Sequence, residues 1–261
     1  LNLEVTERAN LNFRFTRDAL QALKARVMLY MQNWQEAYDA ATALLPKYKL
    51  VDFNTTVGTN ALPWKATSEE AILAWERPFN GANNDLIYAG LLSDEILGLF
   101  DSAADKRSSY IGAAYVYDEN WNPTLIGYRP SSRSASDRTS LRIAEMYLIA
   151  AEAGSYLTGE LDNAKGYLLD LQKMRFSPEG YTAKETAIEA MTAEQFRTEV
   201  ANERARELLI EGHRWFDLRR TTQPSITHTS DGQTYTLYQG DSRYTLPFPQ
   251  SAVNNNPELN N

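Results

Sequence analysis

The part of the sequence best suited to chemistry is a run of glutamates late in the chain. Glu203, Glu207 and Glu211 recur at four-residue steps, so in a helix they lie on one face. Paired carboxylates can act as acid and base in glycoside hydrolysis. Arginines are interleaved with them, however, and a neighbouring arginine lowers the pKa of a carboxyl group, whereas a general acid needs a raised one. The pattern therefore predicts structural ion pairs rather than catalysis, among Glu203, Arg204, Arg206, Glu207, Glu211, Arg214 and Asp217.

Other reactive arrangements are missing from the sequence. There is no cysteine, which excludes disulfides, a thiol nucleophile and zinc–thiolate sites. The two histidines, His213 and His228, have no partner at metal-ligand spacing, and no phosphate loop, nucleophile elbow or dinucleotide fingerprint occurs. We therefore expect no enzyme activity, metal or cofactor. The net charge of −8 also argues against nucleic acid as a partner.

Aromatic side chains among polar ones indicate where a ligand could bind. Sugar rings present flat C–H faces that stack on aromatic rings, while their hydroxyls need amides or charged groups. The stretch 115–122 offers both kinds of group, and a second polar stretch lies at 83–85. Packing within a loop explains each of these residues equally well, except that polar neighbours make burial of Trp121 less natural. The candidate ligand-binding residues are Trp121, Tyr117, Tyr115, Asn120, Asn83 and Asp85.

The elements that would position these residues are helical hairpins. After the N-cap Thr16, apolar residues at three- and four-residue steps (Leu20, Leu23, Val27 and Tyr30) indicate one face of a helix over 17–31. A second helix is expected over 34–45, and the unit returns as helices over 142–157 and 161–174. Small residues recur in both units, including Ala22 and Ala25, and they allow two helices to approach closely. This pattern is typical of tetratricopeptide-like hairpins.

The hairpins leave two long connecting regions. We expect helical pairs at about 16–46, 142–175 and 192–224, the last beginning with a capping box at Thr192 and Gln195. An insertion over about 50–138 contains a possible strand at 71–76 and a short helix at 93–100, and otherwise reads as structured loops. The region 225–261 is mostly loop, with a two-residue hairpin turn at Asp231 and Gly232.

Three segments resemble the SusD/RagB family of nutrient-binding proteins. Residues 203–220 (ERARELLIEGHRWFDLRR) are similar to the family's long charged signature, and residues 142–153 (RIAEMYLIAAEA) are similar to its glutamate- and alanine-rich helix. The tail at 246–251 (LPFPQS), followed by Asn256 and Pro257, resembles the family's proline-flanked ending, from which Phe248 and Ala252 depart.

The resemblance covers nearly the whole chain from Phe13 onward. It implies a mainly α fold of tetratricopeptide-like hairpins in a superhelix, with loop insertions and small β-hairpins, and it identifies residues 1–261 as the C-terminal portion of such a domain. It also implies an outward-facing lipoprotein of the outer membrane, anchored through an upstream lipidated cysteine. Such a protein captures oligosaccharide for a SusC-like TonB-dependent transporter. The alternatives are a peptide-binding, RagB-like uptake protein and a generic tetratricopeptide scaffold.

Overall fold

The computed structural model describes residues 12–55, 58, 61–75, 90–131, 140–230 and 232–259 of the chain. These residues belong to two compact units, Leu1–Glu211 and Gly212–Asn261. The boundary falls between the helices that we expected to form the third pair, so each unit is described by itself.

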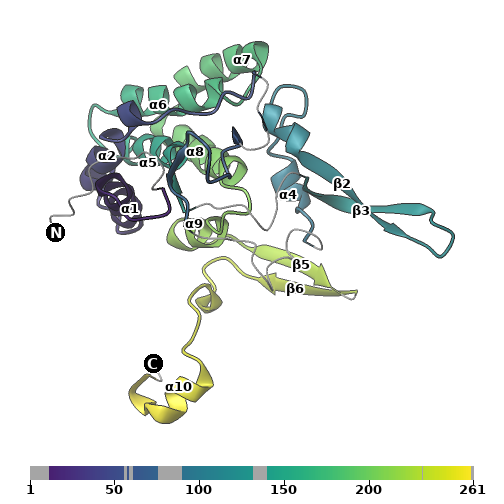
Figure 1. The fold of residues 1–261 in the computed structure, drawn as a ribbon. Helices are drawn as coiled ribbons and strands as arrows, with labels where there is room; N and C mark the ends of the chain where they lie inside the picture. The colour runs from purple at the N-terminus through teal and green to yellow at the C-terminus, as the bar shows by residue number, and fades with distance from the viewer. Residues whose placement is uncertain are drawn as a thin grey trace. The chain divides into compact units, whose positions relative to one another are not determined.

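The fold is mainly α with small antiparallel strand pairs, which confirms the predicted fold class (Figure 1). None of the helices in the described ranges is both long and apolar enough to cross a membrane. The elements of the first unit are α1 (Arg17–Tyr30), α2 (Trp34–Thr42), η1 (Leu45–Lys47), β1 (Ala71–Leu73), α4 (Asp94–Leu97), η4 (Lys106–Tyr110), β2 (Ile111–Tyr117), β3 (Pro123–Pro130), β4 (Leu141–Arg142), α5 (Ile143–Gly154), α6 (Leu161–Lys173), α7 (Pro178–Glu189) and α8 (Ala193–Glu207).

Side-chain caps fix where several helices begin. The Thr16 hydroxyl accepts a hydrogen bond from the Ala19 amide at 3.1 Å, which satisfies an amide that the first turn leaves without a partner. At α8 the capping box is complete, because Thr192 and Gln195 each accept the other's backbone N–H. Ser93 caps α4 in the same manner as Thr16. These starts agree with the sequence.

Small residues hold the first two hairpins together. Ala22 and Ala25 of α1 are fully buried in the core that α1 shares with α2 and α5, as the alanine pattern predicted. The larger residues of the predicted stripe are divided between packed and exposed positions: Leu23 is partly buried against this core, whereas Leu20 and Val27 are 40% and 43% exposed. The predicted stripe is therefore only in part the packed face of α1, because alanines occupy most of the fully buried positions and allow a closer approach than leucine and valine do.

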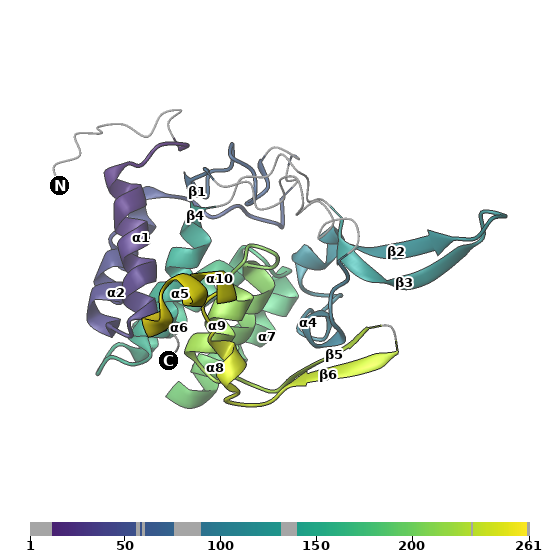
Figure 2. The ribbon, with the colours of Figure 1, turned by 90° about the horizontal axis from the view of Figure 1, so that it is seen from below.

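Helix α5 is the centre of the first unit. One of its sides packs into the core shared with α1 and α2, and its other side packs against α6 and α8 (Figure 2). Helix α7 packs on α6 and was not predicted from the sequence. Its N-terminus is nonetheless marked, because Ser177 caps the helix and Pro178 occupies the first turn.

The insertion contains more regular structure than we predicted. The expected strand at 71–76 is confined to β1, which pairs with β4. Strands β2 and β3 form an antiparallel hairpin over 111–130, where the sequence had been read as loop. In both ribbon views this hairpin extends away from the helices of its unit (Figures 1 and 2).

The second unit contains α9 (Arg214–Arg220), β5 (Ile226–Ser230), β6 (Gln233–Leu237), η5 (Ser242–Tyr244), α10 (Gln250–Asn255) and η6 (Pro257–Leu259). Trp215 stacks on buried Tyr244 with ring centroids 5.1 Å apart. Ser230 pairs with Gln233, so β5 and β6 are joined by two residues as predicted; of these, Asp231 lies outside the described residues.

The packing of α1 gives a first prediction. We expect Ala25→Leu to lower the free energy of unfolding by about 1–3 kcal/mol, because the added atoms overpack a filled interface. The near-isosteric Val27→Thr, on the exposed side of the same helix, should change it by less than about 0.5 kcal/mol. Urea denaturation of both variants measures this, and an equal response would contradict the assignment of the packed face.

Candidate functional site

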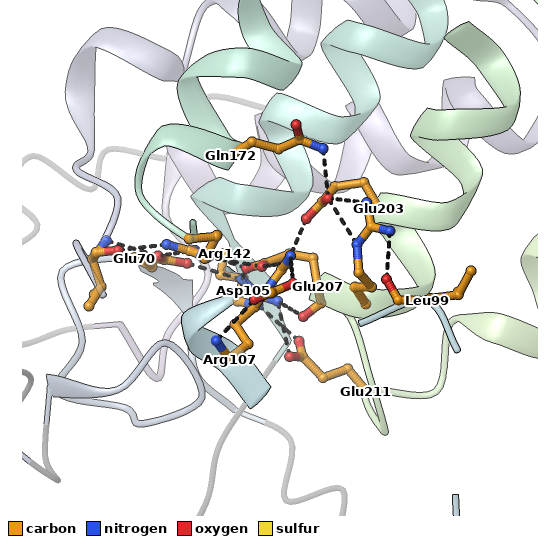
Figure 3. Close-up of polar contacts among 12 residues, drawn as sticks. Glu70, Leu99, Asp105, Arg107, Arg142, Gln172, Glu203, Glu207 and Glu211 are labelled. Carbon is orange, nitrogen blue, oxygen red and sulfur yellow. Dashed lines mark hydrogen bonds and ion pairs between the residues drawn. The ribbon is translucent and has the colours of Figure 1, made fainter. Parts of the chain in front are cut away.

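The signature glutamates form the core of a buried ion-pair network (Figure 3). The Glu207 carboxylate accepts hydrogen bonds from Arg107 at 2.7 Å, Arg142 at 2.6 Å and Arg175 at 2.9 Å. All four side chains are at most 7% exposed. Glu207 therefore joins three guanidinium groups that come from distant parts of the sequence.

Glu203, one turn earlier on α8, extends the network. Its carboxylate accepts from Arg107 at 2.5 Å, Arg206 at 2.6 Å and Gln172 at 2.9 Å. Arg206 lies on the same helix three residues later, which is the arrangement that the spacing predicted. Gln172 belongs to α6, so this carboxylate links α8 to its neighbour.

Two further carboxylates, Glu70 and Glu211, also belong to the network. Glu70 accepts from Arg142 at 3.0 Å and Arg175 at 2.6 Å, and also from the backbone N–H of Val51 at 2.9 Å. Glu211 lies beyond the end of α8 and pairs with Arg142 at 3.0 Å. The network therefore connects α8 to the loop before β1, to β4 and to the end of α6.

The electrostatics of this network do not suit acid–base catalysis. Burial alone would raise the pKa of Glu207, but the charges of Arg175 and Arg142 outweigh burial and hold that pKa well below its usual value. Burial is likewise outweighed at Glu203, where Arg107 and Arg206 lower the pKa to about 2. A general acid would need a pKa near the working pH. The cavity of about 40 Å³ beside Arg107 and Arg142 is far below the size of a usual ligand site.

Arg107 carries the network to the β2–β3 hairpin, which we call the arm (residues 111–130). Besides the two glutamates of α8, its guanidinium binds Asp105 at 2.9 and 2.8 Å. Arg107 lies within η4, which leads directly into β2, and the Ser131 N–H donates to the Tyr110 carbonyl to close the base of the arm. The buried ion pairs thus hold the root of an otherwise exposed hairpin.

One face of the arm is aromatic. Successive side chains of a strand alternate between faces, so Ala113, Tyr115 and Tyr117 share one. The register pairs these three with Tyr128, Leu125 and Pro123, because a bulge at Ile126 shifts β3 by one residue. The aromatic face of the arm, as we call it, comprises Tyr115, Tyr117, Leu125 and Tyr128, and each of these is 42–58% exposed.

The tip of the arm is fixed by its own hydrogen bonds. The Asp118 carboxylate accepts from the backbone N–H groups of Asn120 and Asn122 and from the Asn122 side chain, at 2.8–2.9 Å. Hydrogen bonding from the Asn122 side chain and backbone lowers the pKa of Asp118. Within this loop Trp121 has φ +62°, the left-handed region that bulky residues seldom adopt, and it is 80% exposed. Its ring centroid lies 6.0 Å from that of Tyr117.

The structure groups some of the predicted ligand residues and leaves others undescribed. Tyr115, Tyr117, Asn120 and Trp121 all lie on the distal half of the arm and are exposed. Asn83 and Asp85 lie outside the described residues. Trp64, an aromatic residue elsewhere in the insertion, is buried and packs against Tyr110.

The remaining signature residues are also placed. Arg204 is buried, with its Nε 3.8 Å from Glu152 of α5. In the second unit, Asp217 of α9 binds Arg220 at 2.8 Å, and Arg214 is the first residue of that helix. The sequence did not single out the arginines that surround Glu207. Arg142 opened a recognised motif, but nothing in its spacing indicated that its partners lie 65–72 residues away.

In the described ranges no group of three or more histidine, cysteine, aspartate or glutamate residues could hold a metal ion.

Comparison with known proteins identifies the family. The family model described as "SusD family" matches residues 115–261, more than half of the 261-residue chain, so the chain belongs to the SusD family. No curated protein sequence matches it.

Solved structures share the fold. A SusD superfamily protein from Bacteroides thetaiotaomicron superposes with a TM-score of 0.71 at 23% identity, over 93% of this chain and 59% of that one. A SusD superfamily protein from Bacteroides fragilis superposes with a TM-score of 0.70 at 21% identity, over 98% of this chain and 60% of that one. A SusD-like carbohydrate binding protein from Bacteroides vulgatus superposes with a TM-score of 0.62 at 19% identity, over 92% of this chain and 54% of that one. The chain thus spans little more than half the length of these proteins.

The ion-pair network predicts a loss of stability in acid. Because the folded pKa of Glu203 lies at about 2, below its usual 4.5, its contribution is complete above pH 4.5 and is lost as the pH falls toward 2; Glu207 acts in the same direction. We expect the free energy of unfolding to fall across this interval in urea titrations, and Glu203→Gln to make the fall shallower.

At pH 7 we expect Glu207→Gln to cost about 3–5 kcal/mol, because it leaves buried guanidinium groups without their counter-charge. Glu36→Gln is the control. That carboxylate pairs with Lys24 at the surface, where solvent screens the pair, so its loss should cost far less than the loss of Glu207. Equal effects at the two positions would refute the structural role of Glu207.

The backbone at Trp121 gives a separate prediction. Trp121→Gly and Trp121→Ala both remove the ring, but glycine adopts positive φ without strain. The glycine variant should protect the arm's amides from hydrogen exchange more than the alanine variant does, by about 1 kcal/mol in opening free energy. Equal protection would show that Trp121 is not held in the left-handed region.

Proposed function

We propose that this protein binds oligosaccharide without chemically altering it, and that the aromatic face of the arm together with Trp121 forms at least part of the binding surface. The observation that supports this most is Trp121 itself. A bulky ring is kept 80% exposed, in an unfavourable backbone conformation, by a loop whose hydrogen bonds are satisfied internally. Backbone strain of this kind concentrates at functional sites.

The chemistry of the arm fits a sugar. Exposed tyrosine and tryptophan rings provide flat apolar surfaces, and the hydroxyls of tyrosine with the amide of Asn120 can take part in hydrogen bonds to sugar hydroxyls. One structural relative is described as a carbohydrate binding protein. Asn83 and Asp85 remain candidate ligand residues on the grounds of sequence alone.

Family membership supports the wider setting. We propose an outward-facing lipoprotein of the outer membrane that passes its ligand to a SusC-like TonB-dependent transporter, anchored by a lipidated cysteine upstream of this sequence. The lowered pKa values of Glu203 and Glu207 support binding without turnover, because such carboxylates cannot donate a proton at neutral pH.

Peptide is the alternative ligand. Exposed tyrosine and tryptophan rings also bind peptides, as they do in many protein interfaces. A generic tetratricopeptide scaffold has less support, since an aromatic hairpin rooted in a buried ion-pair network is not needed for stacking repeats.

Calorimetry with pools of oligosaccharides and of peptides tests the proposal. We expect a dissociation constant between about 1 µM and 1 mM for an oligosaccharide. Trp121→Ala should weaken binding at least ten-fold, or about 1.4 kcal/mol. Tyr235→Ala is the matched control, because Tyr235 is 57% exposed on the β5–β6 hairpin. Binding of peptides alone would favour the alternative, and release of shortened sugars in mass spectra would establish an enzyme.

A further inference from the structure

The aromatic face of the arm carries no positive charge. Arg129 is the single basic residue in 111–130, and it pairs with Gly112 in the register. Gly112 lies on the face opposite to Ala113, Tyr115 and Tyr117, so Arg129 does too. The aromatic face therefore offers no guanidinium or ammonium group to a ligand.

The tip adds negative charge beside the most exposed ring. Asp118 and the exposed Glu119 precede Trp121 in the turn. The three hydrogen bonds that the Asp118 carboxylate accepts favour its ionised form. An anionic ligand stacked on Trp121 would meet two carboxylates and no compensating cation of the arm.

The aromatic face is also longer than a single sugar ring. Tyr128 lies opposite Ala113, which is four residues before Tyr117 on β2. At the usual rise of a strand, these two positions are about 14 Å apart along the arm. Trp121 continues the row, since its ring lies next to that of Tyr117. A monosaccharide can cover only part of this row, whereas a linear chain can contact several rings at once.

We propose that the arm selects uncharged, linear oligosaccharides over acidic ones of the same length, and that Glu119 is a specificity-determining residue. This inference rests on the proposed function, because it assumes that sugars bind to the arm. Two consequences follow. Affinity grows with chain length as successive rings are engaged, and a carboxylate on the sugar is penalised near the tip.

The size of the penalty follows from Coulomb's law. Two unit charges about 5 Å apart in water repel by about 0.8 kcal/mol, and physiological salt reduces this by roughly half, which corresponds to about a two- to four-fold loss of affinity. Reversing the charge of one partner changes the affinity by the square of this factor. Glu119→Gln should therefore strengthen binding of an acidic oligosaccharide about two- to four-fold, and Glu119→Lys about four- to sixteen-fold.

The experiment compares neutral oligosaccharides with uronate-containing ones of equal length, from one to four sugar units, by calorimetry at physiological salt. We expect the wild type to prefer the neutral series and to bind longer chains more tightly. Glu119→Lys should shift the preference toward the acidic series. Glu189→Lys, at an exposed position on α7, makes the same change in net charge and should have no effect.

The outcomes separate the two proposals. If no oligosaccharide binds, or if Trp121→Ala leaves all binding intact, the proposed site itself is wrong. If Trp121→Ala weakens binding but acidic sugars bind the wild type as tightly as neutral ones, or Glu119→Lys leaves the preference unchanged, the charge selectivity alone is overturned. Equal affinity for chains of one and of four sugar units would overturn the inference that successive rings of the arm contact one oligosaccharide.

Discussion

The carboxylate of Glu207 is the point on which the first unit depends. Its two oxygens neutralise guanidinium groups that enter from η4, β4 and the end of α6. A buried charge pair gains little over an apolar pair of similar shape, but removing one member leaves the others uncompensated. The network therefore contributes less to net stability than to uniqueness: segments that could pack in several ways have one arrangement in which every charge is paired.

Arg107 connects this network to the exposed arm. An isolated two-stranded hairpin is marginal in water, and the arm buries few residues of its own: Ala114 and Pro130 near its base are buried, whereas both of its faces are exposed farther out. Its direction must be set at the root. Arg107, three residues before the end of η4, supplies this restraint. Its side chain is bonded to Asp105 of its own segment and to Glu203 and Glu207 of α8. The glutamates of the charged signature thus hold the base of the hairpin that carries the exposed rings.

Local signals in the sequence were sufficient to predict α1, α2, α5, α6 and α8, but α7 and α10 were not predicted, and the partners in the ion-pair network could not be found from such signals. Thr16, Ser93 and Thr192 marked helix starts because an N-cap acts within three residues. The repeated alanines indicated a close helix interface, and α1 has one. The arm was missed because Tyr115, Tyr117 and Leu125 are exposed on strands whose other face is also exposed, so the alternation of apolar and polar residues that marks a half-buried strand is absent. The partners of Glu207 were missed for a different reason, since contacts across 65–100 residues depend on the tertiary fold.

The backbone conformation of Trp121 is supported by local hydrogen bonds. Its left-handed conformation costs free energy that the tip must offset locally, and the hydrogen bonds to Asp118 do so without involving the ring. The ring lies next to that of Tyr117 and, at 80% exposure, gains little from burial. A sequence under selection for stability alone would favour glycine or asparagine at such a position. Tryptophan at this position agrees with the proposed function, in which the exposed ring contacts a ligand, and the buried ion pairs at the root of the arm restrain the hairpin that carries the ring.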